Sequence, residues 1–364
     1  MNALNRLTKG CNCMSLDKDG DSRFFWITHS QSQKGRITVV WILTGIGLLA
    51  AAALMGYSRQ RVRRAESEFP PTGEFVTVEG IRLHYNSKGR GRPIVCLHGG
   101  MLSSADYSGV MELASSQYRV LVFDRPGYGY SERPGKGIMT PQNQARLLHE
   151  ALKKLGATEP ILVGHSWSGL LVLSYALQYS DELAGIVLLA PGAYGGKAYP
   201  AGIADRILNA LVLSPFVGKL LLHTLLVPLG GLAVKSVTDA TFAPDPVPHD
   251  YRRLAQAVWP RPAQIRANRE DIEGFIRNAD AVSSRYGELR LPVVIAVGDS
   301  DPFRPELQAY RLHREIPHSK LLKIEHTGHM IPQARPEAVL QALNLLEKEI
   351  AAREGQTGPR TANG

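Results

Sequence analysis

Five short, uninterrupted apolar runs, separated by helix-like stretches, limit this chain to very few folds. They cover residues 94–97, 120–123, 161–163, 186–190 and 293–297. Continuous apolar runs of this length are typical of strands covered on both faces. Between them, one helix is predicted from Thr140 (N-cap) and Pro141 to Leu155, and another from Ser168 to about Tyr179. This alternation predicts an α/β fold with a mostly parallel, doubly wound sheet.

The chain departs from this strand–helix alternation in two places, at its start and at one internal segment. Residues 74–79 and 81–85 alternate like two antiparallel strands around Gly80, and residues 321–324 form a further apolar run. Between residues 192 and 285 only helical segments broken by prolines are found. A long insertion into a compact sheet is usually a functional lid. The predicted organisation is a core in two parts with a helical cap between them: 73–191, 192–285 (cap) and 286–352.

Residues 37–57 contain no charged side chain. As a helix, these 21 residues span about 31 Å, which matches a hydrocarbon core of roughly 30 Å. Trp41 and Tyr57 suit the two membrane interfaces, and Arg36 and Arg59 mark the ends of the span. A cleaved signal peptide usually has a shorter apolar region followed by an A-x-A site, and a buried core helix would show a polar face. We therefore expect an uncleaved, single-pass transmembrane anchor in contact with membrane lipid.

The formal net charge of +9 raises the question of a nucleic-acid partner. Residues 1–72 hold ten Lys or Arg against five acids, so +5 of the excess lies beside the apolar span, where anionic lipids attract it. No nucleic-acid motif accompanies it, so we expect no such partner. Arginines flank both ends of the span, which leaves its orientation open with a slight preference for a cytoplasmic catalytic domain. The expected flanking segments are a disordered tail, a juxtamembrane linker and a second disordered tail: 1–36, 58–72 and 353–364.

One motif carries a chemical prediction by itself. The apolar run 161–163 leads into Gly164-His165-Ser166-Trp167-Ser168-Gly169, and a helix follows directly. A sharp strand-to-helix turn of this kind presents a strained serine as a nucleophile. Small residues two positions before and two positions after the serine allow strand and helix to approach closely, and Gly164 is the first of them. Ser168 stands where glycine is usual, so we expect modest additional crowding there.

A serine hydroxyl needs a base, and that base needs an orienting acid. After the run 293–297 two aspartates compete, and Asp301 is preferred to Asp299 because it begins a proline-bearing turn that can point back over the sheet edge. After the run 321–324 two histidines compete. His329 follows Gly328, which permits a tight loop. His329 is therefore the preferred base, with His326 as its rival.

Serine chemistry also needs N–H donors for the tetrahedral oxyanion. The backbone amide of Trp167, directly after the serine, is one candidate. The second should come from the loop after residues 94–97, where Gly100 is preferred and Met101 is the alternative. His98 is expected to support this loop rather than to act on substrate.

Several motifs together resemble the α/β-hydrolase superfamily, in order and in spacing. They are HGG at 98–100, DRPGYGYS at 124–131, GHSWSG at 164–169, GDSD-x-x-x-P at 298–305 and GHM at 328–330. The resemblance covers about residues 73–350 and is greatest to bacterial carboxylesterases, proline iminopeptidases and cofactor-free haloperoxidases. It implies a cap between the sixth and seventh core strands, catalysis without cofactor or metal, and a bacterial inner membrane for the anchor.

Three functions follow from these observations. The first is hydrolysis of a carboxylic ester or similar small acyl compound by Ser166, His329 and Asp301. The second is an aminopeptidase of the proline iminopeptidase type, in which cap acids would hold a substrate ammonium group. The candidate acids are Asp271, Glu273 and Asp280. The third is a catalytically silent, membrane-tethered binding protein. The substrate's identity and the oligomeric state do not follow from the sequence.

Overall fold

The computed structural model describes residues 25–135, 139–199 and 202–357 of the chain. The chain divides into two units, residues 1–53 and residues 54–364. The described part of the first unit lies in the long helix α1 (Phe25–Glu68). The most apolar 18-residue window of α1 has a mean hydropathy of 2.3, and none of it is buried by protein. By length and composition, α1 is a candidate membrane span.

Helix α1 is longer than expected at its carboxyl end. Residues 58–72 were expected to be a juxtamembrane linker, and in the structure the helix continues through this segment to Glu68 and ends just before Pro70. The segment SRQRVRRAESE lacks glycine and proline, and a helix propagates at little cost once it has been nucleated. Residues 25–36 and 353–357, expected to be disordered, are also helical. The remaining parts of the two predicted tails, residues 1–24 and 358–364, lie outside the described residues.

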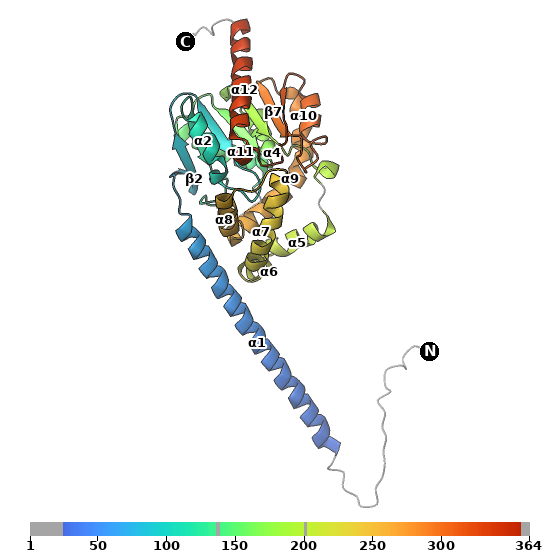
Figure 1. The fold of residues 1–364 in the computed structure, drawn as a ribbon. Coiled ribbons are helices and arrows are strands. Elements are labelled where there is room, and N and C mark those ends of the chain that lie inside the picture. The colour runs from blue at the N-terminus through green and yellow to red at the C-terminus, as the bar shows by residue number, and fades with distance from the viewer. Residues whose placement is uncertain (1–24, 136–138, 200–201, 358–364) are drawn as a thin grey trace, which may run out of the picture. The chain divides into compact units, whose positions relative to one another are not determined.

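The second unit is built on an eight-stranded sheet with the order β1-β2-β4-β3-β5-β6-β7-β8 (Figure 1). Only the pairs β1·β2 and β2·β4 are antiparallel, and the other five pairs are parallel. The strands are β1 (Glu74–Val78), β2 (Ile81–Lys88), β3 (Pro93–Leu97), β4 (Arg119–Phe123), β5 (Ile161–His165), β6 (Gly185–Leu189), β7 (Val293–Gly298) and β8 (Lys320–Ile324). The predicted doubly wound α/β fold is confirmed.

Helices cover both faces of this sheet, which explains the uninterrupted apolar runs. On β3, Val95 and Leu97 belong to one core, whereas Ile94 and Cys96 belong to the core on the opposite face. The first core contains residues of α3 (Pro141–Lys154), α4 (Ser168–Gln178) and α10 (Ala309–Glu315). The second contains residues of α2 (Ser108–Ala114), α11 (Ile331–Ala334) and α12 (Pro336–Thr357).

The segment between β6 and β7, which was expected to form a cap, carries five α-helices in its described part. Its helices are α5 (Ile203–Leu213), α6 (Val217–His223), α7 (Leu226–Phe242), α8 (His249–Val258) and α9 (Pro262–Ser283). They gather at one end of the catalytic unit, away from the carboxyl-terminal end of α12 (Figure 1). The cap has a small core of its own that includes Val234, Phe242 and Trp259 and joins it to Leu102 and Met330 of the sheet-edge loops.

Candidate active site

Ser166 occupies the sharp turn between β5 and α4. Its φ angle is +53°, a left-handed conformation that costs energy for a residue other than glycine. The surrounding backbone holds it there: the Ser166 carbonyl accepts from the N–H groups of Gly169 and Gly192, both at 2.8 Å. A Cβ on Gly164 would lie 2.7 Å from the Ser168 carbonyl oxygen, so this position requires glycine. Ser168 itself is buried and donates its hydroxyl to the His98 carbonyl oxygen at 2.5 Å. The expected crowding at Ser168 is therefore accompanied by a hydrogen bond that glycine could not make.

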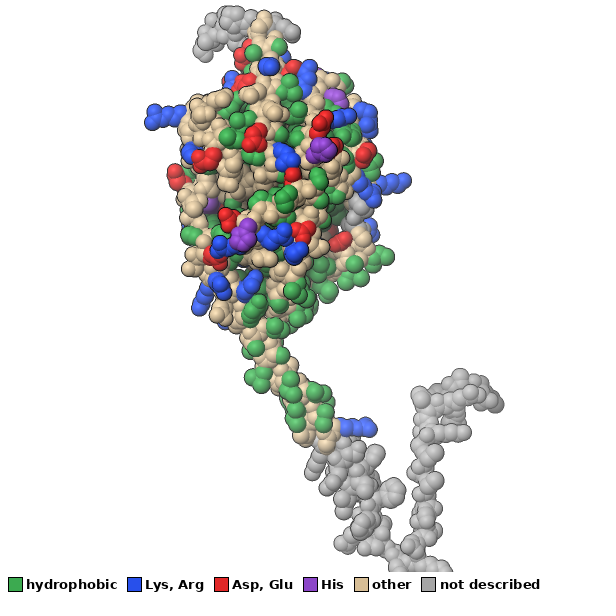
Figure 2. Space-filling view, in the orientation of Figure 1, with side chains coloured by type: hydrophobic (Ala, Val, Ile, Leu, Met, Phe, Trp, Pro, Cys, Tyr) green, Lys and Arg blue, Asp and Glu red, His purple; other side chains and the backbone are tan. Residues whose placement is uncertain are grey.

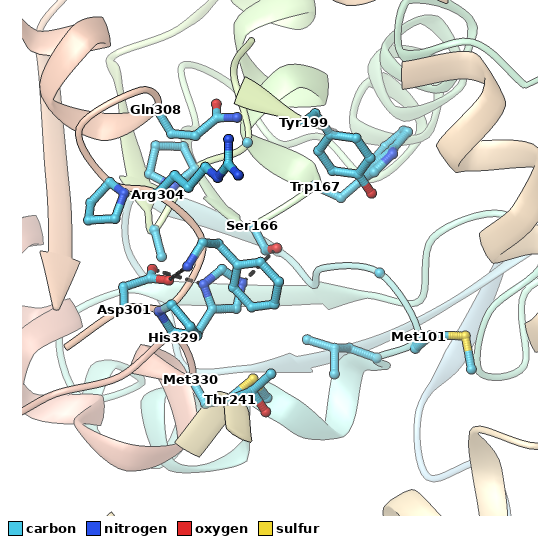
Figure 3. Close-up of a pocket in the computed structure, with 18 of the residues that line it drawn as sticks. Met101, Ser166, Trp167, Tyr199, Thr241, Asp301, Arg304, Gln308, His329 and Met330 are labelled. Atoms are coloured by element: carbon cyan, nitrogen blue, oxygen red, sulfur yellow. Dashed lines mark hydrogen bonds and ion pairs between the residues drawn. The ribbon is translucent and has the colours of Figure 1, made fainter. Parts of the chain in front are cut away.

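The structure brings Ser166, His329 and Asp301 together in one line of hydrogen bonds (Figure 3). His329 Nε2 lies 2.8 Å from Ser166 Oγ, and His329 Nδ1 lies 2.9 Å from Asp301 Oδ2. Burial acts to raise the pKa of Asp301, but the charge of and hydrogen bond to His329, with the Phe303 N–H, outweigh it and lower that pKa. An ionised Asp301 holds a proton on His329 Nδ1 and leaves Nε2 free to accept from Ser166.

The two rival residues, Asp299 and His326, lie outside this line of hydrogen bonds and contact each other. Asp299 is exposed and accepts from the backbone N–H groups of His326 and Thr327, at 3.1 and 3.3 Å. His326 is likewise exposed, with a φ angle of +48°. Asp299 thus fixes the loop that precedes His329, and neither rival contacts Ser166.

Two further contacts position His329, and neither could be predicted from local sequence pattern. Its backbone N–H donates to the Thr241 carbonyl at the end of cap helix α7, at 3.0 Å. Its carbonyl accepts from Nε2 of the fully buried His165, at 2.8 Å. Burial, followed by the nearby His329, lowers the pKa of His165 to about 3, so this ring stays neutral. Because Thr241 is 88 residues away along the chain, only the folded structure reveals this link between cap and histidine.

The loop after β3 lies against Ser166 and presents the candidate oxyanion donors. Gly100, Met101 and Trp167 all line the cavity at Ser166. Met101 has a φ angle of +59°, so the chain turns sharply directly after Gly100. His98 supports this loop as predicted: Nδ1 donates to the Gly99 carbonyl at 2.8 Å, and Nε2 accepts from the Arg125 N–H at 2.9 Å.

A buried ionic cluster centred on Asp271 of cap helix α9 also fixes the loop after β3. Asp271 Oδ2 accepts from Arg125 Nη1 at 2.5 Å, and Asp271 Oδ1 accepts from Arg133 Nη2 at 2.9 Å. Arg125 also donates to the Gly99 carbonyl at 3.0 Å, and Trp167 Nε1 donates to the Asp271 carbonyl at 3.0 Å. The DRPGYGYS motif carries Arg125, but its partner 146 residues later could not be identified from local pattern.

Ser166 opens into a cavity of about 530 Å³ between the sheet edge and the cap. Figure 3 shows Trp167 and Tyr199 on one side of the serine and Met330 and Thr241 on another. The cavity wall is mainly apolar: Met101, Leu102, Trp167, Val237, Trp259, Ile272, Phe303 and Met330. Its polar contributors outside the triad include Asn268, Asp205, Arg304 and Gln308. The cavity suits a compound with one apolar portion and a polar group near the serine.

The acids predicted to hold a substrate ammonium group do not line this cavity. Asp271 is fully buried by its arginine partners, and Glu273 pairs with Arg277 on the same helix. Asp280 is exposed, and neither it nor Glu273 is among the cavity residues. Within the described part of the chain, no cluster of three or more His, Cys, Asp or Glu side chains is suited to a metal ion.

Comparison with known proteins agrees with this architecture. The family model for the alpha/beta hydrolase fold matches residues 92–332. The chain is 28% identical over 271 residues to the uncharacterized hydrolase YugF of Bacillus subtilis, covering 72% of this chain and 93% of the relative. It is 26% identical to a 2-hydroxy-6-oxo-6-phenylhexa-2,4-dienoate hydrolase of Burkholderia cepacia, covering 71% and 90%. A thermophilic esterase from Thermogutta terrifontis has the same fold, with a TM-score of 0.64 at 22% identity, covering 76% of this chain and 99% of that one.

Proposed function

This chain belongs to the α/β-hydrolase fold family, and on that premise we propose that it is a membrane-anchored serine hydrolase acting on a carboxylic ester or similar small acyl compound. The observation that carries the proposal is the array of Ser166, His329 and Asp301, with distances of 2.8 and 2.9 Å, at the wall of an apolar cavity. An α/β-hydrolase fold alone would not identify the reaction, because the same scaffold supports several chemistries.

In the proposed reaction, Ser166 Oγ attacks the substrate carbonyl carbon while His329 Nε2 takes the hydroxyl proton. The backbone N–H groups of Gly100 and Trp167 donate to the resulting oxyanion. When the tetrahedral species collapses, His329 gives its proton to the departing alcohol, and an acyl group remains on Ser166. Water then attacks this ester with His329 again as base, and the acid product leaves. Asp301 holds the imidazole and stabilises its charged form throughout.

The anchor is part of the same proposal. Its support is the uncharged stretch of α1, whose length matches a bilayer and whose most apolar 18-residue window contains no buried residue. Membrane lipid is accordingly the proposed partner of residues 37–57. Sodium carbonate extraction of membranes from expressing cells tests this directly: an integral protein remains in the pellet, whereas a processed soluble form appears in the supernatant.

Fluorophosphonate labelling of the full-length protein and of Ser166→Ala tests the chemistry. We expect labelling of the wild type at Ser166, identified by mass spectrometry of the peptide, and none of the variant. The same pair should differ in turnover of short p-nitrophenyl esters. A folded wild-type protein without label would refute the proposed mechanism and favour the alternative of a silent, membrane-tethered binding protein.

A second candidate is hydrolysis of a 2-hydroxy-6-oxo-dienoic acid. Its support is the similarity to the Burkholderia cepacia hydrolase named for such a substrate. A substrate of this class carries a carboxylate, and Arg304 is the cation that lines the cavity. Direct assay with 2-hydroxy-6-oxo-6-phenylhexa-2,4-dienoate decides between the two: turnover much faster than that of esters would favour this candidate. The aminopeptidase alternative has lost its proposed ammonium-binding acids, and a proline β-naphthylamide assay tests it independently.

A further inference from the structure

Large apolar side chains are exposed in much greater number on the cap than on the rest of the catalytic unit. From residue 58 onward, ten of the fourteen large hydrophobic side chains that are exposed in the described chain lie between residues 203 and 237. The most exposed are Phe216 (88%), Ile203 (78%) and Leu232 (78%). Figure 2 shows hydrophobic side chains gathered on the end of the catalytic unit where Figure 1 places α5, α6 and α7. A contiguous apolar surface of this kind marks a contact site. We call these ten residues the apolar cap face: Ile203, Ile207, Leu211, Phe216, Val217, Leu220, Leu225, Leu229, Leu232 and Val237.

The last turns of α1 are packed against the cap at helix α8. Ser58 and Ala65 are buried on one side of the helix. Arg61 donates to the Gln256 carbonyl of α8 at 3.2 Å, and Arg253 of α8 donates to Glu68 at 2.6 Å. Because four contacting positions are spread over three turns, residues 58–68 are fixed to the cap and do not act as a free tether.

The end of the apolar stretch therefore has a defined neighbour in the catalytic unit. Tyr57 lines a hollow of about 430 Å³ together with Arg61 and with Pro228, Gly231 and Leu232 of α7. Tyr57 is also the last residue of the uncharged stretch, where an aromatic ring suits the membrane interface. If Tyr57 lies at the membrane interface, Leu232, which lines the same hollow, lies near the lipid headgroups too.

The side chains around the apolar cap face carry an excess of positive charge, which an anionic lipid surface attracts. The exposed cations there are Arg59, Arg63, Arg64, Arg206 and Lys219, which outnumber the exposed acids on the same helices, Glu66, Glu68 and Asp205. Burial lowers the pKa of the nearby His223, and Lys219 and Arg59 lower it further, so these two cations lie on the same side of the cap. Basic side chains beside apolar ones are typical of interfacial helices.

The angle between α5 and α6 also suits a shallow contact with a membrane. Together the two helices are apolar and long enough for a span, but they meet at 99°. Two helices with so sharp a bend between them cannot cross the bilayer as one straight span. The arrangement suits two short helices that lie in the membrane interface, with the exposed side chains of Phe216 and Val217 where α6 begins.

We propose that the apolar cap face is a membrane-docking surface that rests in the phospholipid interface and admits substrate from the lipid phase. This inference rests on the proposed function. Cap helices that carry this face also wall the cavity, since Asp205 of α5 and Val237 and Thr241 of α7 line it. The substrate class is accordingly an amphiphilic acyl ester dissolved in the bilayer. A second copy of the chain would also bury the face, but it would not account for the adjoining arginines or for the continuity with Tyr57.

Depth-dependent quenching tests the surface without using activity. The full chain carrying Cys11→Ser and Cys13→Ser retains only Cys96, which is fully buried. A nitrobenzoxadiazole label is placed at Phe216→Cys or Leu220→Cys, with Leu113→Cys on α2 as matched control, in nanodiscs of phosphatidylcholine and phosphatidylglycerol. Doxyl-labelled lipid should reduce emission at Phe216 and Leu220 about twofold, because interfacial helices lie about 5–10 Å into the headgroup boundary, and should leave Leu113 unchanged. Equal insensitivity at all three sites overturns the inference, and emission that depends on protein concentration instead would assign the face to a second copy.

An activity ratio tests the route of the substrate. The double variant Phe216→Glu/Leu220→Glu should lower turnover of a bilayer-borne long-chain ester relative to p-nitrophenyl acetate by about tenfold, since two apolar side chains no longer enter lipid. Leu113→Glu is the control and should leave the ratio unchanged. An unchanged ratio in the double variant refutes entry from the lipid phase. Quenching measured in Ser166→Ala separates the two proposals, because a correct docking surface keeps its quenching even if the proposed chemistry fails.

Discussion

Replacing Asp301 by asparagine should reverse the proton arrangement of the histidine. Asp301 Oδ1 accepts from the Phe303 N–H at 2.8 Å, and Oδ2 faces His329 Nδ1 at 2.9 Å. In Asp301→Asn the carbonyl oxygen must stay at the Phe303 side, because only an acceptor satisfies that N–H. The amide nitrogen then faces Nδ1 and donates to it. His329 consequently carries its proton on Nε2, the atom that should accept from Ser166.

The expected loss in kcat is about 10⁴-fold, the effect of an equivalent wrong tautomer in serine proteases. It corresponds to about 5.5 kcal/mol of transition-state stabilisation. The side chain keeps its size and its Phe303 contact, so we expect thermal unfolding to change much less than catalysis. Steady-state hydrolysis of p-nitrophenyl acetate by the full-length protein in nanodiscs measures kcat, and circular dichroism measures the unfolding temperature.

Asp299→Asn is the matched control, two residues away in the same turn. Asp299 accepts from the N–H groups of His326 and Thr327, and an asparagine carbonyl can keep one of these bonds. We expect kcat to remain within about threefold of wild type, because the lost hydrogen bond is worth about 1 kcal/mol and lies outside the triad. If Asp301→Asn kept a tenth or more of kcat while Asp299→Asn lost activity, the assignment of the orienting acid would be refuted.

Three further outcomes follow from buried groups around the site. Asp271→Ala should lower the free energy of unfolding by about 3–5 kcal/mol in urea titration, because Arg125 would be left buried without its carboxylate. Ser168→Ala should cost about 1 kcal/mol by losing its bond to the His98 carbonyl, with kcat nearly unchanged, and a large catalytic loss would contradict this. Burial raises the pKa of Asp106 from 3.8 to about 7, so the wild type should lose stability as pH rises through that window. Asp106→Asn should remove this dependence, as shown by denaturation at pH 4 and pH 8.

Local sequence patterns were sufficient for the scaffold. The strand positions followed from apolar runs whose alternate side chains, such as Val95 and Cys96, enter the cores on the two faces of the sheet. The position of Ser166 followed from a strand, a turn motif with small residues two positions before and after the serine, and a helix in immediate succession. Hydrophobic periodicity and turn chemistry act over a few residues, so they can be read directly from the chain.

Other features depended on contacts between distant segments. The choice between Asp299 and Asp301 is a question of which way two neighbouring carboxylates point after β7, and only the folded loop that carries His329 answers it. The contact of residues 58–68 with the cap, through Arg61 and the Gln256 carbonyl, could not be identified from local pattern. Asp271 was considered a substrate ligand, whereas in the structure it is enclosed by two arginines from another loop.

The sequence alone determined the α/β-hydrolase scaffold, the order of serine, acid and histidine along the chain, and the uncharged stretch before them. These properties are encoded in short, contiguous stretches, where side-chain polarity and backbone preference act locally. The tertiary structure decided which acid meets His329, what holds the loop of Gly100, and which surface of the cap is left apolar. Each of these depends on residues that are remote in sequence and become neighbours only when the core and the cap pack together.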